Sequence, residues 1–546
     1  MPTRLKTSEL YTLGQSIRAV RNDFGQAMVK TEQRLIDFLL NPHNYPERPS
    51  AVSHLETHIS HVFVGDEFVY KVKKPVNFGF LNFSTLKKRH FFCEKEVILN
   101  SRLAKGIYLG VQPIYKSDRG FSFALHEGGL PVEYAVRMKR ISLDCLLFKL
   151  IGEGKPLYGS LDDVGRTLAL FHENAALYRG RKFGGIESIG AATEENFEQI
   201  KPFTALTINK KILRLLMTYT RTFIADHKDK FAERRRNGYI RDGHGDLHCQ
   251  HICLEHPPII FDCIEFNESF RIIDILEDIA FLFMDLEYRG RFDLSARLHK
   301  AYFARQQKVL DEELVRFYKV YRAVVRGKVE GFAVRNMEDK SEKERAVARA
   351  RDYFGLADYY INYFQKPFNP LVFMGLSGSG KSTIARDFSP NAVILRSDEI
   401  RKEITGHKKD KHAYSSFGEG IYAPELTHQI YCLMLERAIE CARKGKKVIV
   451  DATYLKANQR KDFYETCITK GLNPFFIHCF AREAVLKDRI RNRIEAGTDV
   501  SDADISILEH QLKHLEGPEE LPCYRTLRIN TEDAIHNIVY ALREFL

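Results

Sequence analysis

Short apolar runs and helical stretches alternate along the last third of the chain. Four apolar runs are separated by segments with helical periodicity, and they lie at 371–374, 392–395, 447–450 and 475–480. Strands that alternate with helices are typical of a parallel sheet, because the chain returns to the start of each new strand through a helix. This pattern therefore predicts an α/β domain whose parallel sheet carries helices on both faces.

The N-terminal part of the chain has a different pattern, in which strands follow one another directly. Two β-rich runs, 59–64 and 67–72, flank the dipeptide Gly65-Asp66, which predicts a tight hairpin. An amphipathic helix is expected at 85–103, followed by short strands at 110–114, 120–125 and 134–138. This region is therefore predicted to be α+β.

Helical periodicity dominates at 161–236 and at 273–364, and a strand-rich stretch, 239–262, lies between them. Residues 1–50 also have a helical pattern that ends at proline-containing turns. Two prolines bracket 366–370, which is the clearest linker in the sequence. The expected organisation is a helical extension at 1–29, a first domain at 30–365 and a second domain at 366–546.

The composition is that of a soluble globular protein, with 44% hydrophobic and 28% charged residues among 546. No window approaches the roughly 20 apolar residues of a membrane helix, and the N-terminus lacks the apolar stretch of a secretory signal. The ten cysteines include no Cys-x-x-Cys pair. We therefore expect a cytoplasmic protein with free thiols and no membrane partner.

The formal net charge of +11 suits anionic ligands such as nucleotides or nucleic acid. Basic side chains spread over a solvated surface would give the same excess, so charge does not decide the function.

A phosphate-binding motif follows the first apolar run of the last third. Gly375-x-x-x-x-Gly380-Lys381-Ser382 lies between a strand and a predicted helix, where backbone N–H groups can turn towards phosphate oxygens. Lys381 is expected to reach the β- and γ-phosphates, and Ser382 to coordinate Mg²⁺. The residues expected to hold the nucleotide are Gly375, Ser377, Gly378, Ser379, Gly380, Lys381, Ser382 and Thr383.

Polar residues at the ends of the next strands supply candidate chemistry. Asp398 follows the second strand, where it could accept a proton from an acceptor hydroxyl, although a helix cap would look the same. Asp451 ends the third strand and is expected to reach the Mg²⁺ shell or the acceptor. Arg489 and Arg493 lie one helical turn apart, as on a lid that closes over phosphates, and a solvated basic helix is the alternative.

These segments, together with Ser397-Asp398-Glu399-Ile400-Arg401, resemble the polynucleotide kinase and zeta-toxin-like P-loop kinases over about residues 370–530. The resemblance implies Asp398 as the general base, Arg401 as a ligand of an acceptor phosphate, and Arg489 and Arg493 as lid arginines. Related folds phosphorylate sugars and nucleotides, so the fold does not name the acceptor.

A second chemically dense segment is His244-Gly245-Asp246-Leu247-His248-Cys249-Gln250-His251, and the apolar run Ile259-Ile260-Phe261 then delivers Asp262. This pattern resembles the aminoglycoside phosphotransferase family, which has a bilobal protein-kinase-like fold. The resemblance implies Asp246 as the catalytic base and Asp262 as a Mg²⁺ ligand. It departs from the family at His251, which stands where the family has a metal-binding Asn. We keep His251 as a candidate metal ligand, although imidazole is a poor ligand for Mg²⁺.

Further features fit this second resemblance. Lys71 lies where the family pairs a strand lysine with the nucleotide phosphates, and Lys73 on the same strand face is the alternative. Either Glu94 or Glu96 could pair with this lysine, and we prefer Glu96. Met138 lies in the strand that would contact adenine. A zinc site is another interpretation of the histidine-rich segment, formed by His244, His248, Cys249, His251 and Cys253.

The combined hypothesis is a tandem kinase that uses ATP and Mg²⁺ and transfers phosphoryl groups to hydroxyl acceptors, either small molecules or a polynucleotide 5′-hydroxyl. The whole chain also resembles a bacterial group that fuses these same two domains. Two alternatives remain open. In one, only the P-loop domain is catalytic and the first domain binds a nucleotide or substrate. In the other, the protein is a nucleic-acid repair or modification factor.

Overall fold

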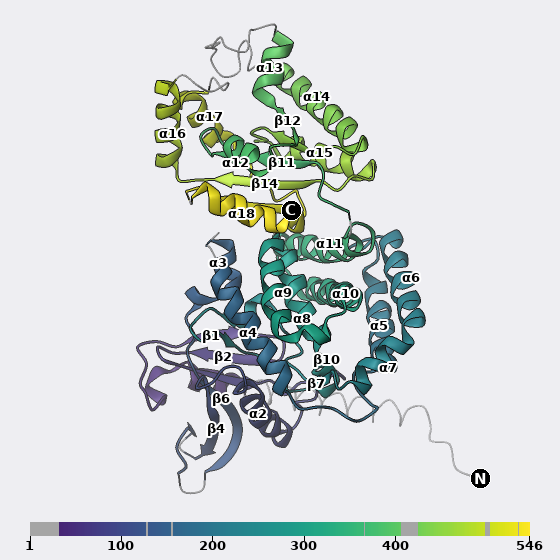
Figure 1. Cartoon of the computed structure of the whole chain (residues 1–546). Coiled ribbons are helices and arrows are strands. Elements are labelled where there is room, and N and C mark those ends of the chain that lie inside the picture. Colours follow the sequence, from purple (N-terminus) through teal and green to yellow (C-terminus); the bar gives the residue numbers. More distant parts are fainter. Residues whose placement is uncertain are drawn as a thin grey trace, which may run out of the picture. The chain divides into compact units, whose positions relative to one another are not determined.

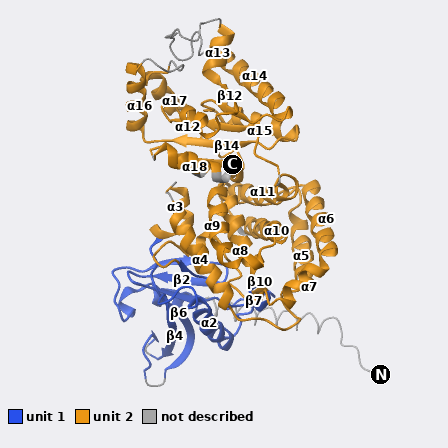
Figure 2. Ribbon diagram, viewed as in Figure 1, with its two compact units in different colours: residues 1–143, 259–271 blue, residues 144–258, 272–546 orange. Residues whose placement is uncertain are grey.

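A computed structural model describes residues 32–118, 120–126, 129–153, 155, 157–364, 366–405, 424–496, 503–532 and 534–546. The chain divides into two compact units, which Figure 2 colours separately. Unit 1 comprises residues 1–143 and 259–271, and unit 2 comprises 144–258 and 272–546. The predicted helical extension at 1–29 lies outside the described residues.

Unit 1 contains a six-stranded antiparallel sheet in the order β1-β2-β3-β6-β4-β5 (Figure 1). Its strands are β1 (Ser53–Glu56), β2 (Ser60–Val64), β3 (Phe68–Lys73), β4 (Tyr108–Ser117), β5 (Gly120–Ser122) and β6 (Leu130–Lys139). The helix α2 (Leu86–Asn100) follows β3, and its N-cap Thr85 accepts a hydrogen bond from the N–H of Lys88. Residues 32–40 are helical, and the two-residue strand β9 (Ile259–Ile260) also belongs to this unit.

The predicted hairpin is present, since β2 and β3 pair in antiparallel register with Val64 opposite Val69. Alternate side chains of β3 point to opposite faces of the sheet. Tyr70 packs in an apolar cluster with Phe63 and Phe123 on one face. Lys71 and Lys73 therefore share the other face, which positions both of them for the site described below.

The first part of unit 2 is helical. Its helices are α3 (Leu147–Gly152), α4 (Tyr158–Asn174), α5 (Ile186–Ile200), α6 (Lys210–Asp226), α7 (Lys228–Arg236), α8 (Ile275–Tyr288), α9 (Phe292–Gln306), α10 (Glu312–Asn336) and α11 (Lys340–Asn362). The predicted strand-rich stretch forms only short strands, β7 (Ile240–Asp242) and β8 (Ile252–Cys253), and β7 pairs with β10 (Ile272–Asp274). The helix α8 is buried along its whole length, which makes it the central helix of this region.

The C-terminal part of unit 2 is built on five parallel strands in the order β12-β13-β11-β14-β15. These are β11 (Leu371–Met374), β12 (Val393–Arg396), β13 (Val448–Asp451), β14 (Phe475–Phe480) and β15 (Thr526–Asn530). The helices are α12 (Lys381–Phe388), α13 (Ser397–Thr405), α14 (Pro424–Arg443), α15 (Ala457–Thr469), α16 (Glu483–Ala496), α17 (Ile505–His514) and α18 (Ile535–Phe545). The predicted parallel sheet is confirmed, and β15 adds a strand that the apolar pattern did not predict.

Both faces of this sheet are buried, as predicted for a parallel sheet. Leu371 and Phe373 of β11 pack in one apolar cluster with residues of α12 and α18. Val372 and Met374, which point the other way, pack in a second cluster with residues of α14 and α15. The mixed α/β class is therefore confirmed, and the carboxyl ends of the strands are left for the site (Figure 1).

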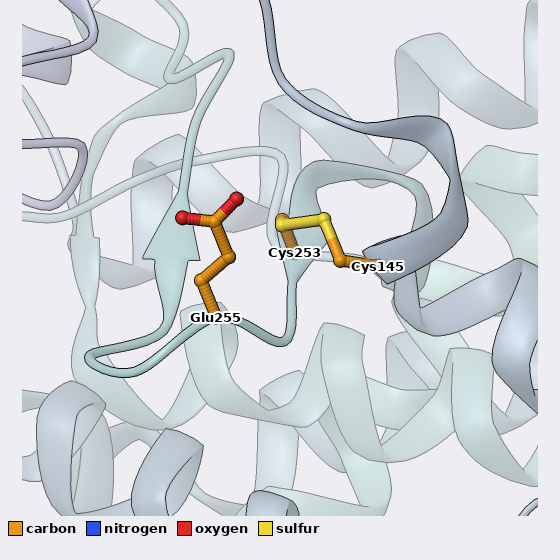
Figure 3. Close-up of side chains that lie close together, drawn as sticks. All are labelled: Cys145, Cys253 and Glu255. Atoms are coloured by element: carbon orange, nitrogen blue, oxygen red, sulfur yellow. A yellow bond between two sulfur atoms is a disulfide. The ribbon is translucent and has the colours of Figure 1, made fainter.

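The expectation that all ten cysteines are free is wrong for two of them. Cys145 and Cys253 form a disulfide across 108 residues of sequence, and Glu255 lies beside it (Figure 3). Because Cys253 is oxidised, it is not available to the alternative zinc site. Within the described ranges, no helix combines the length and the apolar character that a membrane span requires.

Candidate active site

The phosphate-binding motif forms a loop between β11 and α12. Gly375 adopts a φ of +142°, and a Cβ atom there would lie 2.2 Å from the carbonyl oxygen of Cys479. Gly378 adopts a φ of +79°, and its Cβ would lie 2.7 Å from the carbonyl oxygen of Leu486. Only glycine fits both positions, because each combines a left-handed backbone with close contact to another segment. The N-terminus of α12 then begins at Lys381.

A cavity of about 690 Å³ opens beside this loop. It brings together residues that the sequence analysis had taken from four separate segments, and they are Ser377, Gly378, Gly380, Lys381, Ser382, Thr383, Asp398, Arg401, Asp451, Arg489 and Arg493. Gly375 and Ser379 do not line it, and the side chain of Ser379 is fully buried. The residues predicted to hold phosphates and the residues predicted to serve an acceptor therefore line one cavity.

Two aspartates of the cavity are each paired with an arginine. Asp398 lies in the first turn of α13, and its Oδ1 accepts a hydrogen bond of 2.8 Å from Arg401, which is three residues further along the helix. Asp451 ends β13 directly opposite Arg396 of β12, and Nε of Arg396 lies 3.3 Å from its Oδ2. An arginine thus orients each carboxylate, and a carboxylate oxygen is a group that can accept a proton or bind a cation.

The second oxygen of Asp451 is suited to a metal ion. Oδ1 of Asp451 is buried and has no hydrogen-bond partner among the residues that the structure describes. A buried carboxylate oxygen without a partner is costly unless a ligand satisfies it. Ser382 lines the same cavity, and carboxylate and hydroxyl oxygens are the ligands that Mg²⁺ prefers. These two residues therefore fit the predicted cation.

The two predicted lid arginines lie on α16. Arg489 donates to Oγ1 of Thr531 at 2.9 Å and to its carbonyl oxygen at 2.6 Å, and its guanidinium lies 3.4 Å from the carbonyl oxygen of Gly378. Arg493 donates to the carbonyl oxygen of Ala503. Arg489 is thus held against the phosphate-binding loop.

A second cluster of charged residues lies in unit 1. The carboxylate of Glu96, on α2, pairs with two lysines of β3: Oε1 lies 2.9 Å from Nζ of Lys71, and Oε2 lies 2.6 Å from Nζ of Lys73. Lys71 also contacts Asp262 at 2.8 Å, whereas Lys73 contacts the buried Glu265. The structure therefore brings the predicted Lys71, Glu96 and Asp262 together.

Burial distinguishes the two lysines. The side chain of Lys73 is 1% exposed between two buried carboxylates, whereas that of Lys71 is 16% exposed beside Asp262, which is 41% exposed. Burial alone would lower the pKa of Lys71, but attraction to Asp262 and Glu96 raises it well above its ordinary value. Both lysines are therefore charged, and Lys71 is the one that lies near solvent.

Asp262 and Met138 are the other two residues of unit 1 that the sequence analysis named as site residues. Asp262 has a φ of +62°, a left-handed conformation that is uncommon for residues other than glycine and is often found at functional sites. Met138 lies on β6 opposite Val69 of β3, and it packs against the apolar cluster that includes Val136 and Tyr108.

The histidine-rich segment forms a loop after β7 in unit 2. The carboxylate of Asp278, on α8, accepts hydrogen bonds from the N–H groups of His244 and Gly245 at 2.6 and 2.9 Å and contacts Nε2 of His172 at 3.1 Å. Asp285 on the same helix accepts from the N–H of Cys249 at 2.9 Å. The buried helix α8 thus fixes the backbone on both sides of Asp246.

Two histidines contact Asp246 within this loop. His248 accepts a hydrogen bond from the N–H of Gln250 through Nδ1, so in the neutral ring Nε2 carries the proton and points at Oδ2 of Asp246, 3.4 Å away. His251 contacts the carbonyl oxygen of Asp246 through Nδ1 at 2.9 Å. Burial would raise the pKa of Asp246, but His248 and His251 lower it well below its usual range.

The same three residues offer ligand atoms within 4.8 Å of one another. The set Asp246, His248 and His251 overlaps the alternative zinc site predicted from sequence, without its cysteines. The tautomer of His248 argues against a metal on its Nε2, because a nitrogen that carries a proton has no lone pair to donate. His251 remains the predicted ligand.

Comparison with known proteins finds a family model that is similar to the C-terminal region. Residues 371–518 match the family model described as an AAA domain. Over 452 residues the chain is 29% identical to an uncharacterized protein of Mycobacterium tuberculosis, and the match covers 82% of this chain and 87% of the relative. An uncharacterized protein of Mycobacterium bovis matches to the same extent.

Solved structures of kinases are also similar to parts of the chain. A gluconokinase from Sinorhizobium meliloti is 22% identical, covers 32% of this chain and 91% of its own, and gives a TM-score of 0.24. A choline/ethanolamine kinase family protein from Mesorhizobium loti is 12% identical, covers 60% and 99%, and gives a TM-score of 0.34.

The family match covers the phosphate-binding loop, Asp398, Asp451 and both arginines of α16. Residues 371–518 form a P-loop kinase domain. The chain is accordingly a phosphotransferase, and its reaction is nucleotide-dependent phosphoryl transfer.

The P-loop kinase domain contains site residues that the sequence analysis missed. Arg396, Tyr431 and Gln511 line the cavity, and Tyr431 contacts Oγ1 of Thr453 at 3.1 Å. Arg396 directly precedes Ser397 in the sequence, and this position beside a recognised motif is the one local signal that could have identified Arg396 as a site residue. Gln511 comes from α17, far from any motif, and no sequence pattern marks it.

Proposed function

We propose that the P-loop kinase domain transfers the γ-phosphoryl group of ATP, bound with Mg²⁺, to a hydroxyl group of its acceptor. One observation carries this proposal: a single cavity is lined by the phosphate-binding loop, by Asp398 and by Asp451. A phosphoryl donor and a hydroxyl acceptor must meet in one space for in-line transfer, and catalysis then comes mainly from positioning and charge stabilisation.

In this proposal each residue has a defined task. Lys381 and the loop amides hold the β- and γ-phosphates, and Arg489 and Arg493 cover them from α16. Asp398 accepts the proton of the attacking hydroxyl, and Arg401 orients its carboxylate. Ser382 and Asp451 hold the Mg²⁺ ion, which when bound neutralises charge on the phosphate oxygens.

The test is transfer of labelled phosphate from ATP by the full-length protein to pooled nucleosides, 5′-hydroxyl oligonucleotides, sugars and aminoglycosides. The pool is needed because the cavity does not name its acceptor. The full-length protein is used in place of the isolated P-loop kinase domain. Leu371 and Phe373 of the parallel sheet pack in one apolar cluster with Tyr353 and Tyr359 of α11, which lies outside that domain. Lys381→Ala is expected to abolish the transfer that depends on this domain.

Lys444→Ala is the matched control, because Lys444 is an exposed lysine that pairs with Glu440 one helical turn away. It should leave transfer unchanged. The decisive protein is the double variant Lys381→Ala/Asp246→Ala, in which the second proposed site is also inactivated. If this double variant retains more than a tenth of the wild-type transfer, the assignment of the P-loop is wrong.

A second function is favoured by the cluster of Lys71, Glu96 and Asp262. A lysine oriented by a glutamate beside an exposed aspartate is the arrangement that protein-kinase-like enzymes use for phosphates and Mg²⁺. We propose that the N-terminal region is a second kinase, with Asp246 as base, Asp262 and His251 as metal ligands and Met138 beside adenine. The alternative is a binding module without catalysis. Transfer by the Lys381→Ala protein, with and without Asp246→Ala, distinguishes the two.

A further inference from the structure

A glutamine of α17 holds the apex of the phosphate-binding loop. The N–H of Ser377 donates to Oε1 of Gln511 at 2.9 Å, and Nε2 of Gln511 donates to Oγ of Ser377 at 3.0 Å. Each residue is 5% exposed. One side chain therefore makes two hydrogen bonds to one loop residue, although 134 positions separate them in sequence.

This contact changes the role expected for Ser377. Phosphate-binding loops hold their ligand with backbone N–H groups, and the sequence analysis counted Ser377 among the nucleotide-binding residues. In the structure the N–H of Ser377 is bound to Gln511. Ser377 therefore connects the loop to α17, and its neighbours and Lys381 are left to contact the phosphates.

Apolar packing supports the same connection. Leu376, the loop residue before Ser377, is part of a buried cluster with Leu486 and Ile490 of α16 and Leu508 of α17. A Cβ at Gly378 would lie 2.7 Å from the carbonyl oxygen of Leu486, so the loop lies directly against α16 as well. The apex is thus fixed by two helices from outside the loop, and Gln511 supplies the polar part of that contact.

The amide group of Gln511 matches what Ser377 requires. The backbone N–H needs an acceptor and the hydroxyl oxygen can accept a donor, and an amide side chain offers one of each. A residue with an apolar side chain at position 511 would leave the buried N–H of Ser377 without a partner, which is costly and would let the apex move.

We propose that Gln511 is a positioning residue that fixes Ser377, and through it the phosphate-binding loop, in the geometry that binds the nucleotide phosphates. This inference rests on the proposed nucleotide-binding function of the cavity. It assigns to α17 a role in donor binding, whereas the family motifs place that role in the loop and in the arginines of α16.

The experiment measures binding of a non-hydrolysable ATP analogue to the full-length protein by isothermal titration calorimetry. The variants are Gln511→Met, which keeps the length of the side chain, Gln511→Ala, Ser377→Ala and the double variant Ser377→Ala/Gln511→Ala. Two buried hydrogen bonds are lost in the Gln511 variants, so affinity should fall about tenfold or more. Ser377→Ala keeps the bond from its backbone N–H and should show a smaller loss.

The double variant gives the sharpest result. If the hydroxyl of Ser377 acts only through Gln511, the double variant should bind no more weakly than Gln511→Ala alone. Gln306→Ala is the matched control, because Gln306 is a buried glutamine of α9 that donates to the carbonyl oxygen of Ala169. It should lower the melting temperature without changing nucleotide affinity.

Lys381→Ala separates the possible failures. If Lys381→Ala weakens binding while the Gln511 variants bind as the wild type does, the role of Gln511 is overturned and the proposed function stands. If Lys381→Ala also binds normally, the proposed nucleotide site itself is wrong. If the Gln511 variants do not fold, Ser377→Ala decides the question, because wild-type affinity in that variant would overturn the proposal.

Discussion

The P-loop cavity and the lysine–carboxylate cluster of unit 1 are built differently, although we propose that both of them bind phosphates. In the P-loop kinase domain, glycines at 375, 378 and 380 shape a contiguous backbone, and the charged side chains are added around it. In unit 1, Lys71, Glu96 and Asp262 come from three distant segments and are connected by ion pairs. The first site is built mainly from backbone, and the second is built mainly from side-chain charge.

This difference determines which side chains can be removed from each site without loss of its structure. A loop shaped by its own glycines keeps its overall course when a side chain that lines the cavity is truncated, so substitutions of those side chains should affect binding or chemistry more than folding. A buried charge network depends on every partner, because the removal of one charge leaves its partner unpaired in a region of low dielectric constant. The predictions that follow test this contrast.

The largest effect is expected at Asp398. Replacement of a general base typically lowers the rate by about 10²–10⁴-fold, so Asp398→Asn should lower kcat by that amount and change the KM for ATP far less. The melting temperature should change little, because Asp398 contacts Arg401 at the surface of a cavity and supports no core. Steady-state kinetics of the full-length protein provide the measurement.

Asp387→Asn is the control for this variant, because Asp387 is an exposed aspartate of α12. Its kinetics should match the wild type. If Asp398→Asn instead weakens ATP binding while transfer survives, Asp398 belongs with the metal ligands and the acceptor side of the cavity must be reassigned.

The next largest effect concerns the two lysines of β3. Lys73→Met leaves Glu265 and Glu96 buried without one of their partners, and breaking a buried ion pair in this way costs about 3–5 kcal/mol. Lys71→Met should cost clearly less stability, because Lys71 lies nearer to solvent, but it should abolish nucleotide binding by unit 1. Urea denaturation measures the first effect, and nucleotide binding in the Lys381→Ala background measures the second.

An exposed lysine provides the reference for both variants, and Lys444→Met should change neither quantity. Equal destabilisation by Lys71→Met and Lys73→Met would show that the two lysines have one structural role, and the assignment of Lys71 to phosphates would then lose its support.

The sequence predicted the backbone-built site much more completely than the charge-built one. The P-loop could be identified because its residues are consecutive and lie between a strand and a helix. The three central strands β11, β13 and β14 were visible as apolar runs because both of their faces are largely buried, and the edge strand β12 was visible because its residues 393–395 are apolar although only half-buried. The strand β15 was missed because it lies at the sheet edge, where only Leu527 of its five residues is buried and the apolar pattern is broken.

Long-range contacts account for the other misses. Arg396, Gln511 and the disulfide between Cys145 and Cys253 each depend on a partner that is distant in sequence. In unit 1 the sequence placed Lys71 and Lys73 on one face and left the choice between them open. The structure distinguishes them only through the burial of their partners, which no local pattern reveals.

The smallest effect is expected at His251, where the chain departs from the family it resembles. His251 contacts the carbonyl oxygen of Asp246 at 2.9 Å through Nδ1, and the amide of an asparagine can donate a hydrogen bond to the same oxygen. His251→Asn should therefore leave the melting temperature nearly unchanged. The difference lies in the ligand offered to a metal, since imidazole suits Mn²⁺ or Zn²⁺ better than Mg²⁺.

In the Lys381→Ala background, the rate of transfer that depends on Asp246 should accordingly be higher in Mn²⁺ than in Mg²⁺. The substitution His251→Asn should keep or raise the rate in Mg²⁺. The increase should be no more than about tenfold, because one metal ligand changes while Asp262 remains. Direct titration of Mn²⁺ into both proteins gives a second readout, with weaker Mn²⁺ binding expected after the substitution. His256→Asn is the control, since the side chain of His256 is 89% exposed. If neither metal supports transfer that is lost in Asp262→Ala, across the whole acceptor pool, the N-terminal region is no second kinase, and the charge-built site serves binding alone.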